Sequence, residues 1–259
     1  MTKIIFIFFI FSAVLFANTD QSWNLGQAST IEKGRLETGV FLPLRYGITE
    51  TLEVSTFPLF DFIMPNVTIK KNFVNKKDKL YFSTEHSFLY PTLALKLVSK
   101  RGIFGLLPET SKIPQIISTE HAFILTYKFS DYFVVTTRAG LFVPIIFNSV
   151  KDEDFPELDM MLLYQRTISY KGLLVYNLSL DIDGKIFSNF FYGVDVDFYK
   201  SIPAEGKELP LNIESKILLT WKSSKDFAIF LGAKFIWGDY PGGKADLTIL
   251  PLFDVAFTF

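Results

Sequence analysis

The sequence contains no cysteine, and this absence excludes several classes of protein at once. A chain without thiols has no disulfide scaffold, no thiolate metal ligand, no thiol nucleophile and no lipid anchor on an N-terminal cysteine. Two histidines leave little for a zinc site. A surplus of one charge is missing too, because 26 Lys and Arg stand against 27 Asp and Glu. Binding to nucleic acid requires a basic surplus that neutralises phosphate, so we expect no nucleic-acid partner.

Apolar residues are abundant instead. Phe occurs 29 times, aromatic residues make up 17% of the chain, and hydrophobic residues make up 49%. An ordinary soluble domain of this length does not need so much apolar surface for its core.

The N-terminus has the layout of a secretory signal peptide. Lys3 is followed by an apolar stretch over residues 4–16 and by the small residue Ala17. The stretch is shorter than the ~20 apolar residues of a transmembrane helix. We therefore expect residues 1–17 to be a cleaved signal peptide, although Leu15 is large for its position and an uncleaved anchor is the alternative. Five Phe leave with this segment, so the aromatic excess persists in the mature chain.

Beyond Ala17 a long apolar run is absent. The longest stretch without a charged residue, 139–150, has twelve residues and contains Pro144. A bilayer-spanning helix needs ~20 residues, so the mature chain does not cross a membrane as helices. Apolar and polar residues alternate instead, for example over 174–183 and 190–198. Alternation with period two over about ten residues is typical of tilted strands in a membrane barrel, and strands of soluble sandwiches are shorter.

The alternation predicts an all-β fold: a single transmembrane antiparallel β-barrel of about 12 strands, with 10–14 possible. Residues 35–259 form the barrel, and residues 18–34 are an N-terminal segment that is either an extra strand or a segment in the lumen. The expected strands are 35–46, 51–56, 67–74, 80–91, 117–129, 132–143, 160–169, 173–183, 187–199, 211–222, 227–237 and 247–259.

This assignment contains a conflict. Short turns at 46–50, 75–78, 130–131 and 170–172 follow odd-numbered strands, but a barrel with a periplasmic C-terminus has its short turns after even-numbered strands. A strand is therefore missed or merged, and the candidates are residues 23–33 as an extra first strand or a misread connection between 183 and 211. A soluble β-sandwich or a periplasmic lipid-binding barrel is the alternative fold.

The last strand carries the most specific pattern. Apolar residues occupy its odd positions, ending with Phe253, Val255, Phe257 and the final residue Phe259. This strand resembles the C-terminal strand of bacterial outer-membrane β-barrel proteins, in which a terminal aromatic residue and alternating apolar residues are read by the barrel-assembly machinery. The resemblance implies a bacterial outer-membrane location, with the assembly machinery and outer-membrane lipid as partners. It implies no particular activity.

The opposite parity assigns charged side chains to the lumen. Ten acidic and six basic residues fall on this face: Glu37, Arg45, Glu53, Lys70, Glu85, Glu120, Lys128, Arg138, Asp181, Asp183, Asp195, Asp197, Glu214, Lys216, Lys234 and Asp254. Charges away from bulk water must be paired or hydrated, so the set fits an ion-paired filling or a narrow watery passage. With a turn placed near 184–186, Asp181 and Asp195 lie ~20 Å apart along the strands, which disfavours a metal site. We expect no metal and no cofactor.

A short repeat contains both histidines. Ser-Thr-Glu-His occurs at 83–86 and again at 118–121. Some outer-membrane lipid hydrolases resemble barrels with Ser, His and an acidic residue near the rim, so Ser83, Ser118, His86 and His121 are the residues to test for catalysis. Adjacent Glu and His point to opposite faces of a strand, which prevents a Glu–His relay within either copy. Cross-strand pairing of Glu85 with Glu120, or of His86 with His121, remains open.

Two functions of different classes follow. The favoured hypothesis is a porin-like passive channel or small-solute transporter of the Gram-negative outer membrane. The rival is a barrel with a filled lumen that serves a structural or surface-interaction role. An enzyme is the least favoured interpretation. The solute and the oligomeric state are not encoded in any pattern described above.

Overall fold

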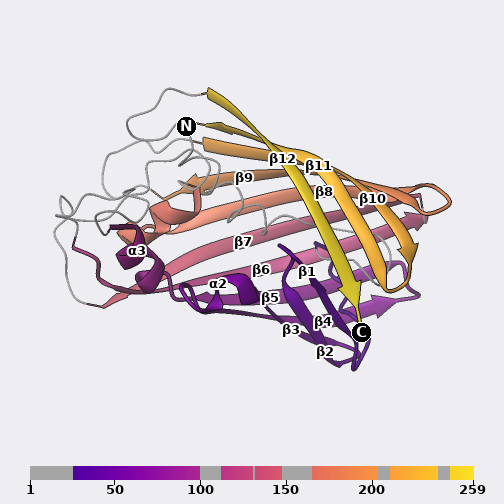
Figure 1. Ribbon diagram of the computed structural model, residues 1–259, viewed down its shortest axis with the longest axis horizontal. Coiled ribbons are helices and arrows are strands. Elements are labelled where there is room, and N and C mark those ends of the chain that lie inside the picture. The colour runs from indigo at the N-terminus through magenta and orange to yellow at the C-terminus, as the bar shows by residue number, and fades with distance from the viewer. Residues whose placement is uncertain (1–25, 100–111, 131, 148–164, 203–210, 239–245) are drawn as a thin grey trace.

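The structure is a computed structural model that describes residues 26–99, 112–130, 132–147, 165–202, 211–238 and 246–259. Within these residues twelve antiparallel strands close a single barrel, in which sequential strands are neighbours and β1 also pairs with β12 (Figure 1). The predicted antiparallel barrel of about 12 strands is confirmed. The strands are β1 (Leu36–Gly39), β2 (Leu44–Thr49), β3 (Leu52–Thr56), β4 (Asn66–Lys76), β5 (Leu80–Leu89), β6 (Gln115–Ser130), β7 (Phe133–Phe147), β8 (Val175–Phe187), β9 (Phe190–Ser201), β10 (Leu211–Ser224), β11 (Phe227–Gly238) and β12 (Asp246–Thr258).

Short helical segments interrupt the connections between strands. They are α2 (Pro58–Asp61), α3 (Thr92–Ser99) and a helical turn at 165–167 that continues into the 3-10 helix η3 (Ile168–Lys171). In the part of the chain that the structure describes, no helix has the length and apolar character needed to span a membrane.

Two of the expected strands are wrong, and the two errors cancel in the count. The expected strand 35–46 is divided into β1 and β2. The Asp254 carboxylate accepts hydrogen bonds from the backbone N–H groups of Val40 and Phe41, and the chain turns inward after β1. Pro43 follows and has no N–H to donate to a neighbouring strand, so the strand is interrupted here. The expected strand 160–169 is helical over its described residues 165–169.

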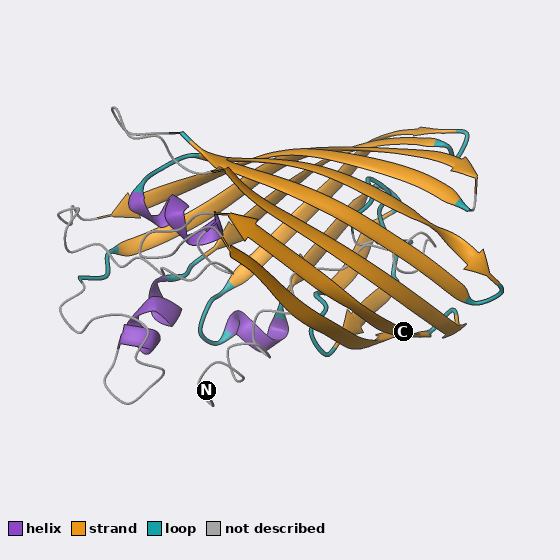
Figure 2. Ribbon diagram, turned by 90° about the horizontal axis from the view of Figure 1, so that it is seen from above, coloured by secondary structure: helices purple, strands orange, loops and turns teal. Residues whose placement is uncertain are grey.

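The corrected strand order resolves the turn conflict. Connections of two or three residues follow β2, β4, β6, β8 and β10, and connections of four to 27 residues follow the odd-numbered strands. Lys77, Asp78 and Ser188 have positive φ angles, as tight hairpin turns require. The helical segments lie away from the end that carries the tight turns and the C-terminus (Figure 2). Short turns at one end and long loops at the other are typical of outer-membrane barrels.

Side chains alternate between a buried inner face and an exposed outer face. In β8, Asn177, Ser179 and Asp181 are buried, and Leu178 and Leu180 between them are exposed. The barrel is therefore apolar outside and largely polar inside, the reverse of an ordinary soluble domain.

Exposed tryptophans mark the edges of the apolar outer band. Trp237 pairs with Ile213, which lies eight residues along β10 from Trp221. At ~3.3 Å per residue and a tilt of 35–45°, the two indoles are ~20 Å apart along the barrel axis, close to the ~25 Å height of the apolar band in outer-membrane barrels.

The barrel wall is uneven in height. Strands β6 and β7 contain 16 and 15 residues, whereas β1, β2 and β3 contain only four, six and five. The three short strands lie beside the C-terminus, at the end of the tight turns (Figure 1). Their side of the barrel is thus much lower than the side formed by β6 and β7.

Candidate functional site

A belt of ion pairs runs along the inner wall from β1 to β3. Arg45 on β2 donates to both oxygens of Glu53 on β3 at 2.8 Å, and to Glu37 on β1 at 3.0 Å. Arg35 donates a further bond to Glu37 at 3.1 Å. Arg45, Glu37 and Glu53 are only 2%, 1% and 3% exposed. Bidentate geometry of this kind is the strongest form of an Arg–carboxylate pair.

The belt continues with alternating sign from β4 to β7. Lys70 on β4 lies 3.9 Å from carboxylate oxygens of both Glu53 and Glu85. Arg138 on β7 donates to Glu85 on β5 at 2.8 Å and to Glu120 on β6 at 2.5 Å. Side chains of Arg138 and Glu120 are 19% and 20% exposed, so water reaches this part of the belt but hardly reaches the part between β1 and β4. Glu85 and Glu120 are thus joined through one arginine.

A second cluster involves an arginine outside the strands. Arg166, in the helical turn after β7, donates to both oxygens of Glu214 on β10 at 2.8 and 3.0 Å, and to the Tyr199 hydroxyl at 2.8 Å. Lys234 on β11 also donates to Glu214. Burial alone would lower the pKa of Arg166, but the carboxylate of Glu214 holds that pKa well above its ordinary value. The cluster therefore holds the described end of the β7–β8 connection, from residue 165 onward, against β10.

The aspartates of β8 and β9 lie together, contrary to the expected separation of ~20 Å. The turn falls at residues 188–189, so Asp181 is directly opposite Asp195. Asp195 is paired with Lys216 on β10, and Asp197 accepts a hydrogen bond from Ser179. No group of three or more His, Cys, Asp or Glu side chains among the described residues is placed to hold a metal ion.

The described part of the N-terminal segment lies against the inner wall. The backbone N–H of Ala28 donates to the Thr126 hydroxyl at 2.8 Å, and the carbonyl oxygen of Ala28 accepts from Asn72 at 2.9 Å and from Ser83. The N–H of Ile31 donates to Glu53 at 3.1 Å. Ala28 and Ile31 are fully buried. Residues 27–31 thus contact β3, β4, β5 and β6 from inside.

The opposite inner wall is apolar. Leu42, from the β1–β2 connection, packs inside the barrel with Leu218, Phe230 and Leu252 on β10, β11 and β12. Ala228 and Ala256 complete the cluster, and all of its members are at most 3% exposed. The interior therefore combines a belt of charges with an apolar patch on β10–β12, and Lys234 and Asp254 lie beside this patch on β11 and β12.

The other residues expected in the lumen or in assembly are placed as follows. Asp254 is buried and caps the chain after β1, and Lys128 is half-buried near the tight-turn end of β6. The proposed assembly residues are on the outer face of β12, where Phe253, Phe257 and Phe259 are exposed and Val255 is half-buried. The expected signal peptide, residues 1–17, lies outside the described residues.

The Ser-Thr-Glu-His repeats do not form a catalytic group. Ser83 and Ser118 are buried on the inner face, whereas His86 and His121 are directly opposite each other on the outer face, with their Nδ1 atoms 2.9 Å apart. The sheet thus separates each serine from the histidine of its own repeat. The register brings together the two histidines, which is one of the pairings that the sequence left open.

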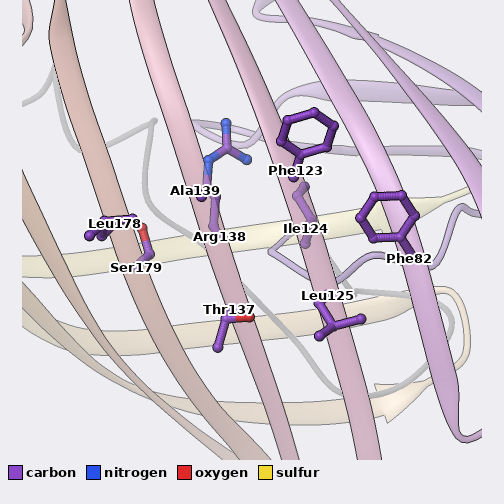
Figure 3. Close-up of a pocket in the computed structure, with 9 residues that line it drawn as sticks. All are labelled: Phe82, Phe123, Ile124, Leu125, Thr137, Arg138, Ala139, Leu178 and Ser179. Carbon is purple, nitrogen blue, oxygen red and sulfur yellow. The ribbon is translucent and has the colours of Figure 1, made fainter.

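A shallow hollow of about 280 Å³ lies on the outer wall over β5, β6, β7 and β8 (Figure 3). The rings of Phe82 and Phe123 stack at its edge with centroids 6.1 Å apart, and Leu125 and Leu178 flank the smaller Thr137. Phe123, Leu125 and Leu178 are exposed, so the hollow belongs to the apolar outer surface and not to the lumen.

Sequence parity missed some interior residues. Arg166 was assigned to a strand that does not exist, and no alternation pattern signals a connection that folds into the barrel. Lys222 is buried on β10 with the same parity as Lys216, so extending the alternation to the end of that strand finds it. Its Nζ lies 4.0 Å from the centroid of the Phe191 ring.

No family model and no curated protein matches the chain. Among solved structures, the chain is similar to a KdgM porin in complex with disordered oligogalacturonate, with 9% identity, a TM-score of 0.44, and coverage of 87% of this chain and 95% of that one. It is also similar to outer-membrane expressed OmpT of Vibrio cholerae (8% identity, TM-score 0.44) and to the outer membrane channel DcaP of Acinetobacter baumannii (13%, 0.41). Each of these two alignments covers 84% of this chain, which spans 64% and 62% of those proteins. All three scores are below 0.5, so the fold assignment depends on the strand register of this chain itself.

Proposed function

We propose that the protein is an outer-membrane β-barrel of the Gram-negative envelope that acts as a narrow small-solute channel. The observation that carries the proposal is the inverted distribution of side chains: an apolar outer band between two tryptophan levels encloses a wall of paired charges. In hydrocarbon only helices and closed barrels satisfy their backbone hydrogen bonds, and this barrel is closed. Export by residues 1–17, and recognition of the outer face of β12 by the assembly machinery, are parts of the same proposal.

The passage would run along the wetter side of the belt. Arg138, Glu120 and Arg166 have partly exposed side chains, and Arg138 and Arg166 each have carboxylate partners. A passage lined by both signs selects small polar solutes by size more than by charge.

The N-terminal segment is the proposed restriction of this passage. Residues 27–31 bond to four strands, β3, β4, β5 and β6. A segment that lies against four neighbouring strands from inside narrows an aqueous path at that level.

A filled-lumen structural barrel is the second candidate, because the ion pairs between β1 and β4 and between β10 and β11 are almost completely buried. Planar bilayers distinguish the two functions. The mature chain is expected to give small, infrequent current steps, and a variant lacking residues 18–33 larger and more frequent ones. A silent bilayer with both proteins, after insertion is verified by protease protection, supports the filled barrel and refutes the channel.

A further inference from the structure

The low section of the barrel wall lies at the height of the membrane. Strand β1 joins β12 through three register pairs, Glu37↔Thr258 to Gly39↔Ala256, whereas β11 joins β12 through twelve. Beyond Ala256, β12 continues for ten more residues to Asp246. Strands β1, β2 and β3 lie at the tight-turn end of the barrel (Figure 1). The wall that they form therefore falls short at the opposite end, where the long loops are.

The height that is missing is about half of the apolar band. A tilted strand rises ~2.5 Å along the barrel axis per residue, so the four to six residues of β1, β2 and β3 reach only ~10–15 Å of a band that is ~25 Å high. Among the residues that the structure describes, the strands between β12 and β4 therefore end near the middle of the proposed membrane.

An apolar connection lies at the β3–β4 side of this low section (Figure 1). Residues 57–65, between β3 and β4, read Phe-Pro-Leu-Phe-Asp-Phe-Ile-Met-Pro. Phe62 is 91% exposed and Leu59 is also exposed. The one charged residue, Asp61, accepts hydrogen bonds from Thr56 and Asn66. A loop that faces water is normally polar. The apolar composition of residues 57–65 suits contact with hydrocarbon instead.

The backbone of this connection is suited to the same place. Phe60 N–H bonds to the carbonyl oxygen of Phe57, and the N–H groups of Ile63 and Met64 bond to that of Phe60. Internal bonding of this kind is what non-strand backbone needs at membrane depth. In Figure 1, α2 lies part of the way along the barrel, whereas α3 lies at its end.

The inner wall next to the low section is apolar as well. Phe230 on β11 and Leu252 on β12 are buried and pack with Leu42 of the β1–β2 connection, and Leu250, two residues before Leu252, is buried as well. The exposed apolar connection and the apolar inner patch thus lie on the same side of the barrel.

We propose that the low wall between β12 and β4 is a lateral portal that admits the hydrocarbon chain of a single-chain amphiphile, such as a long-chain fatty acid, to the inner patch of Leu42, Phe230, Leu250 and Leu252. The 57–65 connection covers the portal, and Leu42 moves aside for the chain. This site takes an apolar ligand from the membrane, so it is independent of the aqueous passage and of the conductance that tests it.

Photolabelling distinguishes this site from ordinary lipid contact. The full mature chain in phosphatidylcholine nanodiscs is irradiated with palmitic acid that carries a mid-chain diazirine, and labelled residues are identified by mass spectrometry. A portal predicts labelling of inward Leu250, Leu252 and Leu42 that excess unlabelled palmitic acid abolishes. Labelling confined to outward Ile249 and Phe253, and insensitive to competition, overturns the proposal.

Two variants and a control test the route. Leu42→Gln, outside every strand, is expected to weaken inner labelling about tenfold because a buried apolar contact is lost. Leu178→Gln on the far outer wall is the matched control and leaves inner labelling unchanged. Heat-modifiable gel migration verifies folding. Should Leu42→Gln not fold, Phe62→Ser removes an exposed cover side chain and is expected to speed inner labelling; equal rates in Phe62→Ser and the parent chain refute the portal.

Discussion

Replacing Arg45 by methionine tests whether the part of the belt between β1 and β3 is dry. Arg45 makes three charge-assisted hydrogen bonds, two to Glu53 and one to Glu37, and all three side chains are at most 3% exposed. Methionine fills a similar volume but leaves two carboxylates without their main partner.

The expected loss follows from this burial. Removing one member of a buried ion pair costs ~3–5 kcal/mol, because the remaining charge is uncompensated, whereas an exposed pair is worth ~0–1 kcal/mol. Arg35 still binds Glu37, and Lys70 remains 3.9 Å from Glu53. These partners compensate in part, so we expect the free energy of unfolding to fall by about 3 kcal/mol, the lower end of the range.

The assay is reversible urea unfolding of the barrel in phospholipid vesicles, followed by tryptophan fluorescence. A triple variant, Arg45→Met with Glu37→Gln and Glu53→Gln, removes the charges as well and is expected to recover most of the lost stability. A loss below about 1 kcal/mol for Arg45→Met would show that water solvates the belt, and the argument for a dry wall would then be refuted.

Three further variants test other contacts. A Cβ atom on residue 47 would lie 2.0 Å from the backbone oxygen of Glu32 in the N-terminal segment, so Gly47→Val should displace that segment. The displaced segment should become accessible to protease added to intact vesicles, and unchanged protection contradicts the packing. Asp181→Asn removes a like charge directly opposite Asp195 and should raise the free energy of unfolding by up to about 1 kcal/mol in the urea assay, whereas any decrease contradicts the repulsion. Arg166→Met removes a bidentate bond to Glu214, which keeps its bond to a lysine, and should cost about 1.5–3 kcal/mol with faster proteolysis of the β7–β8 connection; a neutral effect contradicts the clamp.

Parity along the strands was sufficient to predict the fold class, whereas the strand number was right only because the errors at 35–46 and 160–169 cancelled. Period-two alternation assigns each residue to one of two faces, so Glu214, Lys216 and Lys234 could be placed inside without knowledge of their partners. Alternation contains no information about where a strand is interrupted. The break after Gly39 depends on a carboxylate 215 residues away, since Asp254 binds the next two backbone N–H groups.

Register was the other quantity that the sequence did not determine. A turn placed at 184–186 instead of 188–189 shifted the partner of Asp195 from Asp181 to a residue near 176, and an acidic pair was therefore overlooked. Arg166 was missed for a different reason: its role depends on a connection that folds back onto Glu214, 48 residues later in the chain. Such long-range contacts depend on closure of the barrel, which no local pattern describes.

The paired charges link the stability of the barrel to the opening of its lumen. A soluble domain is stabilised by an apolar core, but here the belt from Glu37 to Glu120 fills that place, and ion pairs of this kind are strong only while water is excluded. Water that entered beside Lys70 would weaken its long 3.9 Å contacts first, because the bidentate Arg45 pair retains direct hydrogen bonds. Residues 27–31 bond to Lys70, Asn72 and Glu53 at this same level. Departure of that segment is therefore the step that would hydrate the weakest part of the belt, and a channel that opens by this route gains conductance and loses stability together.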